Sequence, residues 1–75
     1  MASIKARFGR TVRGLRTKAG YSQESFADDI HVHRTSMGTI ERGEGNPGLE
    51  TIVKIARGLD VSLSELFVAV EKDTG

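Results

Sequence analysis

The chain has 75 residues, with 11 basic residues, 10 acidic residues and no cysteine. It is therefore expected to form one small domain without a disulfide or a thiolate metal site. No apolar run is long enough to span a bilayer and no secretory signal precedes the first helix, which predicts a cytoplasmic protein. The net charge of +1 hides an asymmetry, because residues 1–20 hold six basic residues and no acidic one. Such a positive pole favours a polyanionic partner met by one face, and a solvated basic helix is the alternative.

Residues 3–19 are expected to form an amphipathic helix that Gly20 ends, because apolar residues recur at steps of three and four. The apolar stripe comprises Ile4, Phe8, Val12, Leu15 and Ala19. Arg7, Arg10 and Arg13 lie on the opposite side of this predicted helix. Arg10 and Arg13 are candidates to contact phosphate, although they are equally compatible with a solvated surface.

Ser22 is a suitable N-cap for a second short helix, and Gly43 is a suitable end for a third helix over residues 34–42. The segment 31–33 is the tight turn between them. The inward side chains of the two helices are Phe26, Ala27, Ile30, Met37 and Ile40. The outward face of the third helix then carries small or polar residues, namely Arg34, Thr35, Gly38 and Thr39.

The rest of the chain predicts a loop and two more helices. Residues 44–48 form the loop, because they hold the glycines and the proline. A fourth apolar stripe follows as Leu49, Ile52, Val53, Ala56 and Leu59. Ser62 and Glu65 match a capping box that opens a fifth helix. The tail 71–75 is polar and expected to fray. The sequence thus predicts one all-α domain of five helices, with its core over about residues 3–70.

Four segments together resemble one known family. LRTKAGYSQESFA, RTSMGTIERG, NPGLETIVKIA and LDVSLSELF are similar to the Cro/C1 (XRE) helix-turn-helix proteins, over roughly residues 5–67. The small size is similar to that of restriction-modification controller proteins. The resemblance implies a phage-repressor-like fold with its helix-turn-helix at the second and third helices. It also implies a transcription regulator, repressor or activator, that binds a palindromic operator on double-stranded DNA as a homodimer.

Three residues depart from the family pattern. His31 and Asp60 stand where the family commonly has glycine, at positions that need a positive φ angle. His33 stands at the N-cap of the third helix, where serine, threonine or aspartate is the better physical choice. We expect these departures to affect local stability more than function.

The outward face of the third helix is the part that the family presents to DNA bases. Arg34 can donate two hydrogen bonds to guanine, and Thr35 and Thr39 can bond several bases or pack against the thymine methyl group. Contacts with phosphate are expected from the ends of the second and third helices and the loop that follows. The candidates for phosphate contact are Gln23, Ser22, Ser36, His33, Arg42 and Asn46. The alternative for Arg34 is a solvated surface arginine, for Ser36 no DNA contact, and for Ser22 its role as a helix cap.

Two further sets have structural roles. By the family resemblance, Arg16 and Glu41 form a partly buried ion pair. The fifth helix has an apolar side that a monomer of this size cannot fully cover, so it is expected to form the dimer interface. The interface candidates are Leu63, Leu66, Phe67 and Val70. The alternative is that this side only closes the monomer core.

No pattern in the sequence predicts an enzyme, a cofactor or a small-molecule ligand. His31 and His33 lie two residues apart in a turn, a spacing that rarely gives a closed metal site, so no metal is expected. His33 could instead meet a phosphate when protonated. Two other functions stay open. One is an antitoxin or protein-interaction module with secondary DNA binding, and the other is a non-specific nucleic-acid or chaperone-like helical domain.

Overall fold

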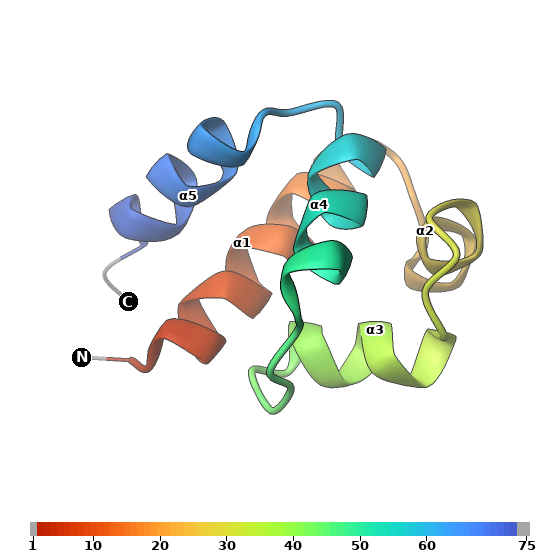
Figure 1. The fold of residues 1–75 in the computed structure, drawn as a ribbon, viewed down its shortest axis with the longest axis horizontal. Helices are drawn as coiled ribbons and strands as arrows, with labels where there is room; N and C mark the ends of the chain where they lie inside the picture. The colour runs from red at the N-terminus through yellow and green to blue at the C-terminus, as the bar shows by residue number, and fades with distance from the viewer. Residues whose placement is uncertain (1, 74–75) are drawn as a thin grey trace.

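The computed structural model describes residues 2–73. Within this range the chain forms five α-helices and no strand (Figure 1), so the predicted all-α architecture is confirmed. The helices are α1 (Ile4–Lys18), α2 (Gln23–Asp29), α3 (Arg34–Glu41), α4 (Leu49–Gly58) and α5 (Leu63–Lys72). None of the helices in the described range is long and apolar enough to cross a membrane.

Helix α1 is set by a cap at each end. The Ser3 side chain accepts a hydrogen bond from the Ala6 amide at 3.1 Å, which satisfies one of the amides that a helix start leaves free. Gly20 has a φ angle of +87°, the left-handed conformation in which helices commonly end. Both ends lie within a residue of the predicted positions.

The segment that links α2 to α3 adopts the tight turn that the sequence predicts. Ser22 caps α2 by accepting a hydrogen bond from the Ser25 amide at 3.1 Å. His31 has a φ angle of +58°, so a histidine occupies the left-handed position that glycine would fill without strain. The His33 Nδ1 atom accepts a hydrogen bond from the Thr35 amide at 3.1 Å. A histidine can therefore serve here as the N-cap of α3.

Helices α4 and α5 also begin and end where the sequence indicates. Asp60 has a φ angle of +58°, which matches the second position where glycine is the usual choice. Ser62 and Glu65 form the predicted capping box, with hydrogen bonds of 3.0 and 2.9 Å in the two directions. Helix α5 continues to Lys72, so it includes the first two residues of the tail that the sequence predicts to fray, and Asp73 is extended. Residues 74–75 of that tail lie outside the described range.

Helix α1 is the centre of the packing and contacts both α3 and α5 (Figure 1). The core takes at least one side chain from every helix. Its buried hydrophobic residues are Phe8, Val12, Phe26, Ala27, Ile30, Met37, Ile40, Ile55, Ala56, Leu66 and Val70. Among the residues assigned to apolar stripes, Ile4, Ala19 and Leu49 are exposed. Ile4 and Leu49 stand at the starts of their helices, with 58% and 82% of their surface exposed.

Candidate nucleic-acid interface

Helix α3 has one side in the core and one side in solvent. Met37, Ile40 and Glu41 are buried, and they fasten the back of the helix to α1 and α2. Arg34, Thr35 and Ser36 are exposed. A short helix anchored in this way can enter the major groove, since its free side carries no apolar group that must stay dry.

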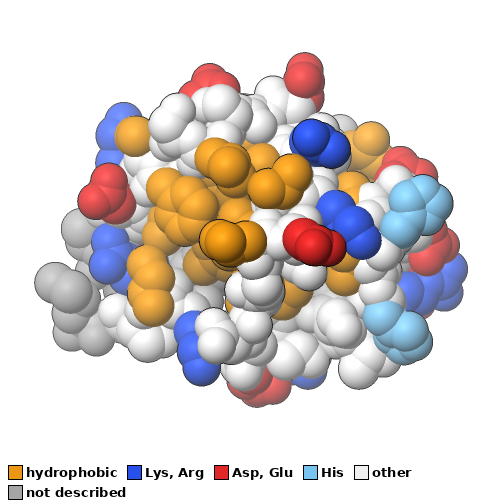
Figure 2. Space-filling view, in the orientation of Figure 1, with side chains coloured by type: hydrophobic (Ala, Val, Ile, Leu, Met, Phe, Trp, Pro, Cys, Tyr) orange, Lys and Arg blue, Asp and Glu red, His pale blue; other side chains and the backbone are white. Residues whose placement is uncertain are grey.

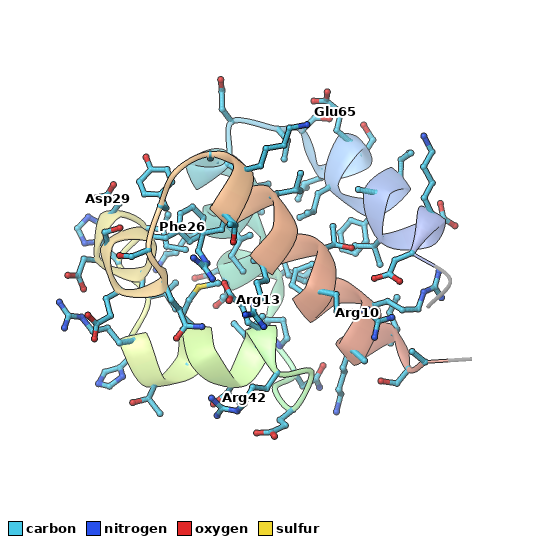
Figure 3. The ribbon with its side chains drawn as sticks, turned by 180° about the vertical axis from the view of Figure 1, so that it is seen from behind. Arg10, Arg13, Phe26, Asp29, Arg42 and Glu65 are labelled. Carbon is cyan, nitrogen blue, oxygen red and sulfur yellow. The ribbon has the colours of Figure 1, made fainter. Side chains whose placement is uncertain are left out.

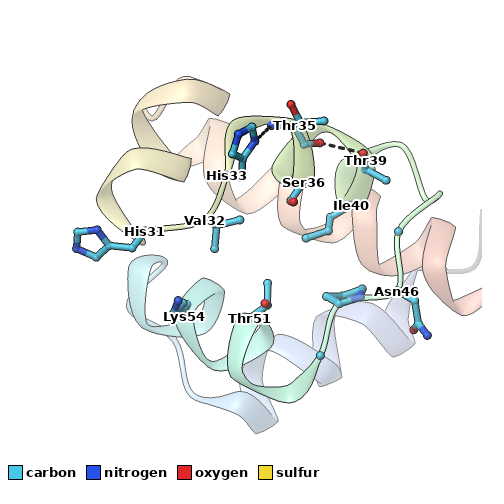
Figure 4. A pocket seen from close by; sticks show the side chains of 13 residues that line it. His31, Val32, His33, Thr35, Ser36, Thr39, Ile40, Asn46, Thr51 and Lys54 are labelled. Atoms are coloured by element: carbon cyan, nitrogen blue, oxygen red, sulfur yellow. Dashed lines mark hydrogen bonds between the residues drawn. The ribbon is translucent and has the colours of Figure 1, made fainter.

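Beside this free side runs a groove of about 470 Å³ between α3 and α4 (Figure 4). His33, Ser36 and Thr39 line it from the α3 side. Thr51 and Lys54 line it from α4. The sequence prediction did not include these two residues. The signal for Lys54 was its place as a basic residue between the apolar positions Ile52, Val53 and Ala56, outside the stripe of α4. The groove adds a cation and a hydroxyl beside the predicted phosphate-contacting residues.

Arg34 is exposed but not free. Its Nε donates to Asp28 Oδ1 at 3.1 Å and its Nη2 to Asp28 Oδ2 at 2.8 Å. Its Nη1 lies 3.5 Å from Glu24 Oε2. The hydrogen bonds from Arg34 lower the pKa of Asp28 below its usual range, and the same bonds raise the pKa of Arg34. The predicted base-reading residue is therefore paired with two carboxylates of α2 that the sequence prediction did not include.

Arg16 and Glu41 form a two-point ion pair between α1 and α3. Arg16 Nε donates to Glu41 Oε2 at 2.7 Å, and Nη2 donates to Oε1 at 2.9 Å. A further bond from Nη1 reaches the Tyr21 carbonyl at 2.8 Å. Both side chains are buried, and the hydrogen bonds with Glu41 raise the pKa of Arg16 despite the opposing effect of burial.

Gln23 joins this pair from the start of α2. Its Nε2 donates to Glu41 Oε1 at 3.0 Å, which fixes the amide group in one orientation. The Nε2 atom has a second hydrogen, so the oriented amide can still donate to a phosphate. Ser22 differs, because its hydroxyl accepts from the Ser25 amide and donates to the Ser25 hydroxyl at 2.9 Å. Its role as a cap thus competes with a phosphate contact.

Gly38 does not belong to the outward face, and that part of the prediction is wrong. It is buried, because Gln23 and Arg42 cover it. A Cβ atom at this position would lie 3.1 Å from Arg42 Nη1 and 3.3 Å from Gln23 Oε1. The glycine therefore makes room for the side chains beside α3 rather than for the floor of a DNA groove.

The remaining candidates lie at the C-terminal end of α3 and in the loop after it. Thr39 is partly buried, and its hydroxyl donates to the Thr35 carbonyl at 2.9 Å. Arg42 is exposed and its Nε donates to Glu44 at 3.2 Å. Asn46 is exposed at the end of the groove. The contacts of these residues with bases or phosphates stay predictions.

Two of the α1 arginines are engaged within the protein. Arg7 donates to the carbonyl oxygens of Val70, Glu71 and Asp73 at 3.2, 3.1 and 2.7 Å. Arg10 donates twice to the Asp73 carboxylate, each time at 3.0 Å, beside the C-terminal end of α5 (Figure 3). These bonds neutralise the end of α5, where the helix dipole is negative. Part of the basic charge in residues 1–20 therefore serves to hold α5 against α1.

The apolar side of α5 divides into a buried and an exposed part. Leu66 and Val70 have no exposed surface, because they pack in the core, and the assignment of this helix to a dimer interface stays a prediction. Leu63, Phe67 and Val68 are 45%, 37% and 47% exposed. Figure 2 shows hydrophobic side chains gathered on the face that α4 and α5 share. We call the exposed residues Ile4, Leu63, Phe67 and Val68 the apolar face.

A small apolar cleft of about 110 Å³ lies within this face. Ile4 and Phe67 line it together with Phe8 and Pro47. The rings of Phe8 and Phe67 lie 5.9 Å apart between their centroids, so the core continues into the exposed face. Elsewhere, the described residues contain no group of three or more histidine, aspartate or glutamate side chains that could hold a metal ion.

Comparison with known proteins agrees with this geometry. A sequence model of the helix-turn-helix family matches residues 12–66. The control protein C.MunI of a Mycoplasma species is 46% identical over 74 residues, which cover 97% of this chain and all of that protein. The control protein C.BamHI of Bacillus amyloliquefaciens is 40% identical over 66 residues, 87% of this chain and 82% of that protein.

A solved structure supports the same assignment. The restriction-modification controller protein C.AhdI of Aeromonas hydrophila superposes with a TM-score of 0.79 at 42% identity, over 83% of this chain and 94% of that chain. The sequence match, the two control proteins and the shared fold agree with the buried back and free front of α3. The chain therefore belongs to the helix-turn-helix family of DNA-binding transcription regulators.

Proposed function

We propose that this protein is a restriction-modification controller that regulates transcription by binding a palindromic operator as a homodimer. The observation that carries the proposal is α3, which buries Met37, Ile40 and Glu41 and leaves Arg34, Thr35 and Ser36 in solvent. The near full-length similarity to control proteins supports the biological role. In this proposal the protein acts by binding DNA, without a catalytic step. Its place of action is the cytoplasm.

Affinity selection from a random duplex library tests sequence-specific binding directly. We expect enrichment of a duplex with two-fold symmetry, whose half-sites lie one helical turn, about 34 Å, apart. The enriched duplex is the operator in the experiments below. A library that shows no enrichment, together with salt-sensitive binding to any duplex, would instead support non-specific binding. Neighbouring methyltransferase and endonuclease genes would support the controller role.

Replacing Arg34 with alanine is expected to weaken operator binding by about 1–3 kcal/mol more than binding to a scrambled duplex. The reason is that the bidentate contact of arginine with guanine distinguishes bases, whereas phosphate contacts do not. Fluorescence anisotropy at fixed salt measures both affinities. Gln23→Ala is the matched control, because loss of a phosphate contact lowers both affinities alike. An equal loss on both duplexes for Arg34→Ala would contradict its base-reading role.

The homodimer is proposed to form through the apolar face, with the cleft beside Phe67 at its centre. These side chains are exposed and adjoin the core, and they come from the start of α1 and from α5. In a two-fold dimer each side chain is used twice, so a few such residues bury a useful apolar area. Dimer formation would also remove these exposed hydrophobic side chains from water.

Leu63→Asp is expected to shift the dimer toward monomer by about 1.5–3 kcal/mol for each buried leucine. Asp is favourable in the first turn of a helix, so the change spares α5 itself. Sedimentation equilibrium measures the dissociation constant. Ser64→Asp is the control, since it adds the same charge in the same turn of α5, at an exposed position outside the apolar face. An unchanged dimer in Leu63→Asp would show that the interface lies elsewhere.

A further inference from the structure

The ion pair between Arg34 and Asp28 occupies only one edge of the guanidinium group. Asp28 takes Nε and Nη2, at 3.1 and 2.8 Å. Arginine has five N–H donors in a planar fork, and the side-on bond leaves the hydrogens that Nη1 and Nη2 direct away from the side chain. That outer edge has the spacing that guanine O6 and N7 accept. The Glu24 carboxylate lies 3.5 Å from Nη1, a longer contact that guanine has to displace from this edge. Arg34 can therefore keep Asp28 and bind guanine in place of Glu24.

We propose that Asp28 is a positioning residue for base recognition, which holds the outer edge of Arg34 toward guanine. The inference deepens the proposed function and depends on it, because it assigns the orientation of the base-reading side chain to a residue on the preceding helix. Asp28 acts through Arg34 and need not touch DNA. A carboxylate at the DNA-facing side of a regulator is otherwise unfavourable, since it repels phosphate.

The contacts single out Asp28 rather than Glu24. Asp28 makes two hydrogen bonds, whereas Glu24 makes one longer contact of 3.5 Å, and 70% of the Glu24 side chain is exposed. The backbone of Asp28 is also fixed, because its carbonyl accepts from the His31 amide at 3.2 Å. The hydrogen bonds from Arg34 lower the pKa of Asp28. Asp28 therefore stays ionised under the conditions in which DNA binding is measured.

An arginine without this restraint would lose selectivity. The arginine side chain has several rotatable bonds, and a free one can reach a phosphate as readily as a base edge. A phosphate contact adds affinity for every sequence. Removing the carboxylate should therefore raise binding to arbitrary DNA and lower the preference for the operator. Simple removal of phosphate repulsion would raise both affinities by the same factor.

The test compares Asp28→Asn with Asp29→Asn on the operator selected by the wild-type protein and on a scrambled duplex of equal composition. Asp29, labelled in Figure 3, is adjacent, exposed and of equal charge. It borders a hollow with Lys54 and Arg57 of α4. We expect Asp28→Asn to lower the ratio of operator affinity to scrambled-duplex affinity by at least about fivefold. This value is the lower end of the discrimination that one bidentate base contact provides. Asp29→Asn should leave the ratio unchanged.

A second readout separates positioning from a general effect on stability. Operators with single base-pair changes should show that Asp28→Asn loses discrimination at the same base pair as Arg34→Ala, and at no other. In an Arg34→Ala background, Asp28→Asn should leave the ratio unchanged. Both variants change exposed side chains, so thermal unfolding should remain cooperative with a similar midpoint.

Several outcomes would overturn the proposal. If Asp28→Asn and Asp29→Asn raise both affinities alike, the carboxylate acts only by repulsion. If Asp28→Asn raises the ratio, Asp28 restrains Arg34 from the base instead of presenting it. Either result leaves the proposed function intact, because the wild-type protein has still selected an operator. If selection enriches no duplex, the proposed function and this inference both fail.

Discussion

Replacing Glu41 with alanine is expected to lower the free energy of unfolding by about 3–5 kcal/mol, because it leaves the buried Arg16 guanidinium without its carboxylate. Arg16 donates two hydrogen bonds to the Glu41 carboxylate, at 2.7 and 2.9 Å. Gln23 loses its partner in the same variant. Urea unfolding followed by circular dichroism measures the change. A loss of this size would leave little of the stability that a 75-residue domain has.

The double variant Arg16→Met with Glu41→Leu is the control for this result. It removes both charges and keeps similar volume, so no buried charge is stranded. We expect its stability to lie closer to that of the wild type than the stability of Glu41→Ala. If Glu41→Ala costs less than about 1 kcal/mol, a value typical of exposed pairs, solvent must reach Arg16 and the pair is not a buried one.

Gly9→Ala is expected to be the other strongly destabilising change, at about 3 kcal/mol, the upper end for overpacked sites. A Cβ atom at Gly9 would lie 2.7 Å from the carbonyl oxygen of Glu41, and it would also meet the carbonyl oxygen of Ile40. These are backbone atoms of α3, so the clash can be relieved only by moving α3 away from α1. Thermal unfolding measures the loss.

Gly14→Ala on the same helix provides the matched comparison. Nothing lies within 4 Å of a Cβ atom there. Alanine has lower conformational entropy to lose than glycine, so this variant should gain about 0.5–1 kcal/mol. Two identical substitutions five residues apart on the same helix should thus change stability in opposite directions. A tolerated Gly9→Ala would mean that α1 and α3 are separated more widely than the structure has them.

Local sequence signals predicted the helices because their causes are local. Ser3 and Ser22 bond amides three residues away, and His31 and Asp60 adopt their positive φ angles within single turns. A cap or a turn needs no information from the rest of the chain. Apolar periodicity then predicted most of the inward side of each helix. It failed at the exposed helix ends, as at Ala19 and Leu49, and it omitted the fully buried Ile55.

The interface needed information that a helical wheel does not contain. A wheel groups Leu66 with Phe67 on one side of α5, but only the position of α1 decides that Leu66 is covered and Phe67 is partly exposed. In the same way, Gly38 is buried by side chains from α2 and from its own helix end. The pair of Asp28 and Arg34 joins two helices across the turn, six residues apart, and no single periodicity places them together.

The bonds of Arg7 and Arg10 with the end of α5 have a mechanical consequence. Helix α1 is fixed to α5 by these arginines and to α3 by Arg16 and by the close approach at Gly9. In a dimer joined through α5, each subunit would therefore rotate as a rigid body. The tolerance for operator spacing would then be set at the joint between subunits, and an extra base pair between half-sites would have to be absorbed by the DNA.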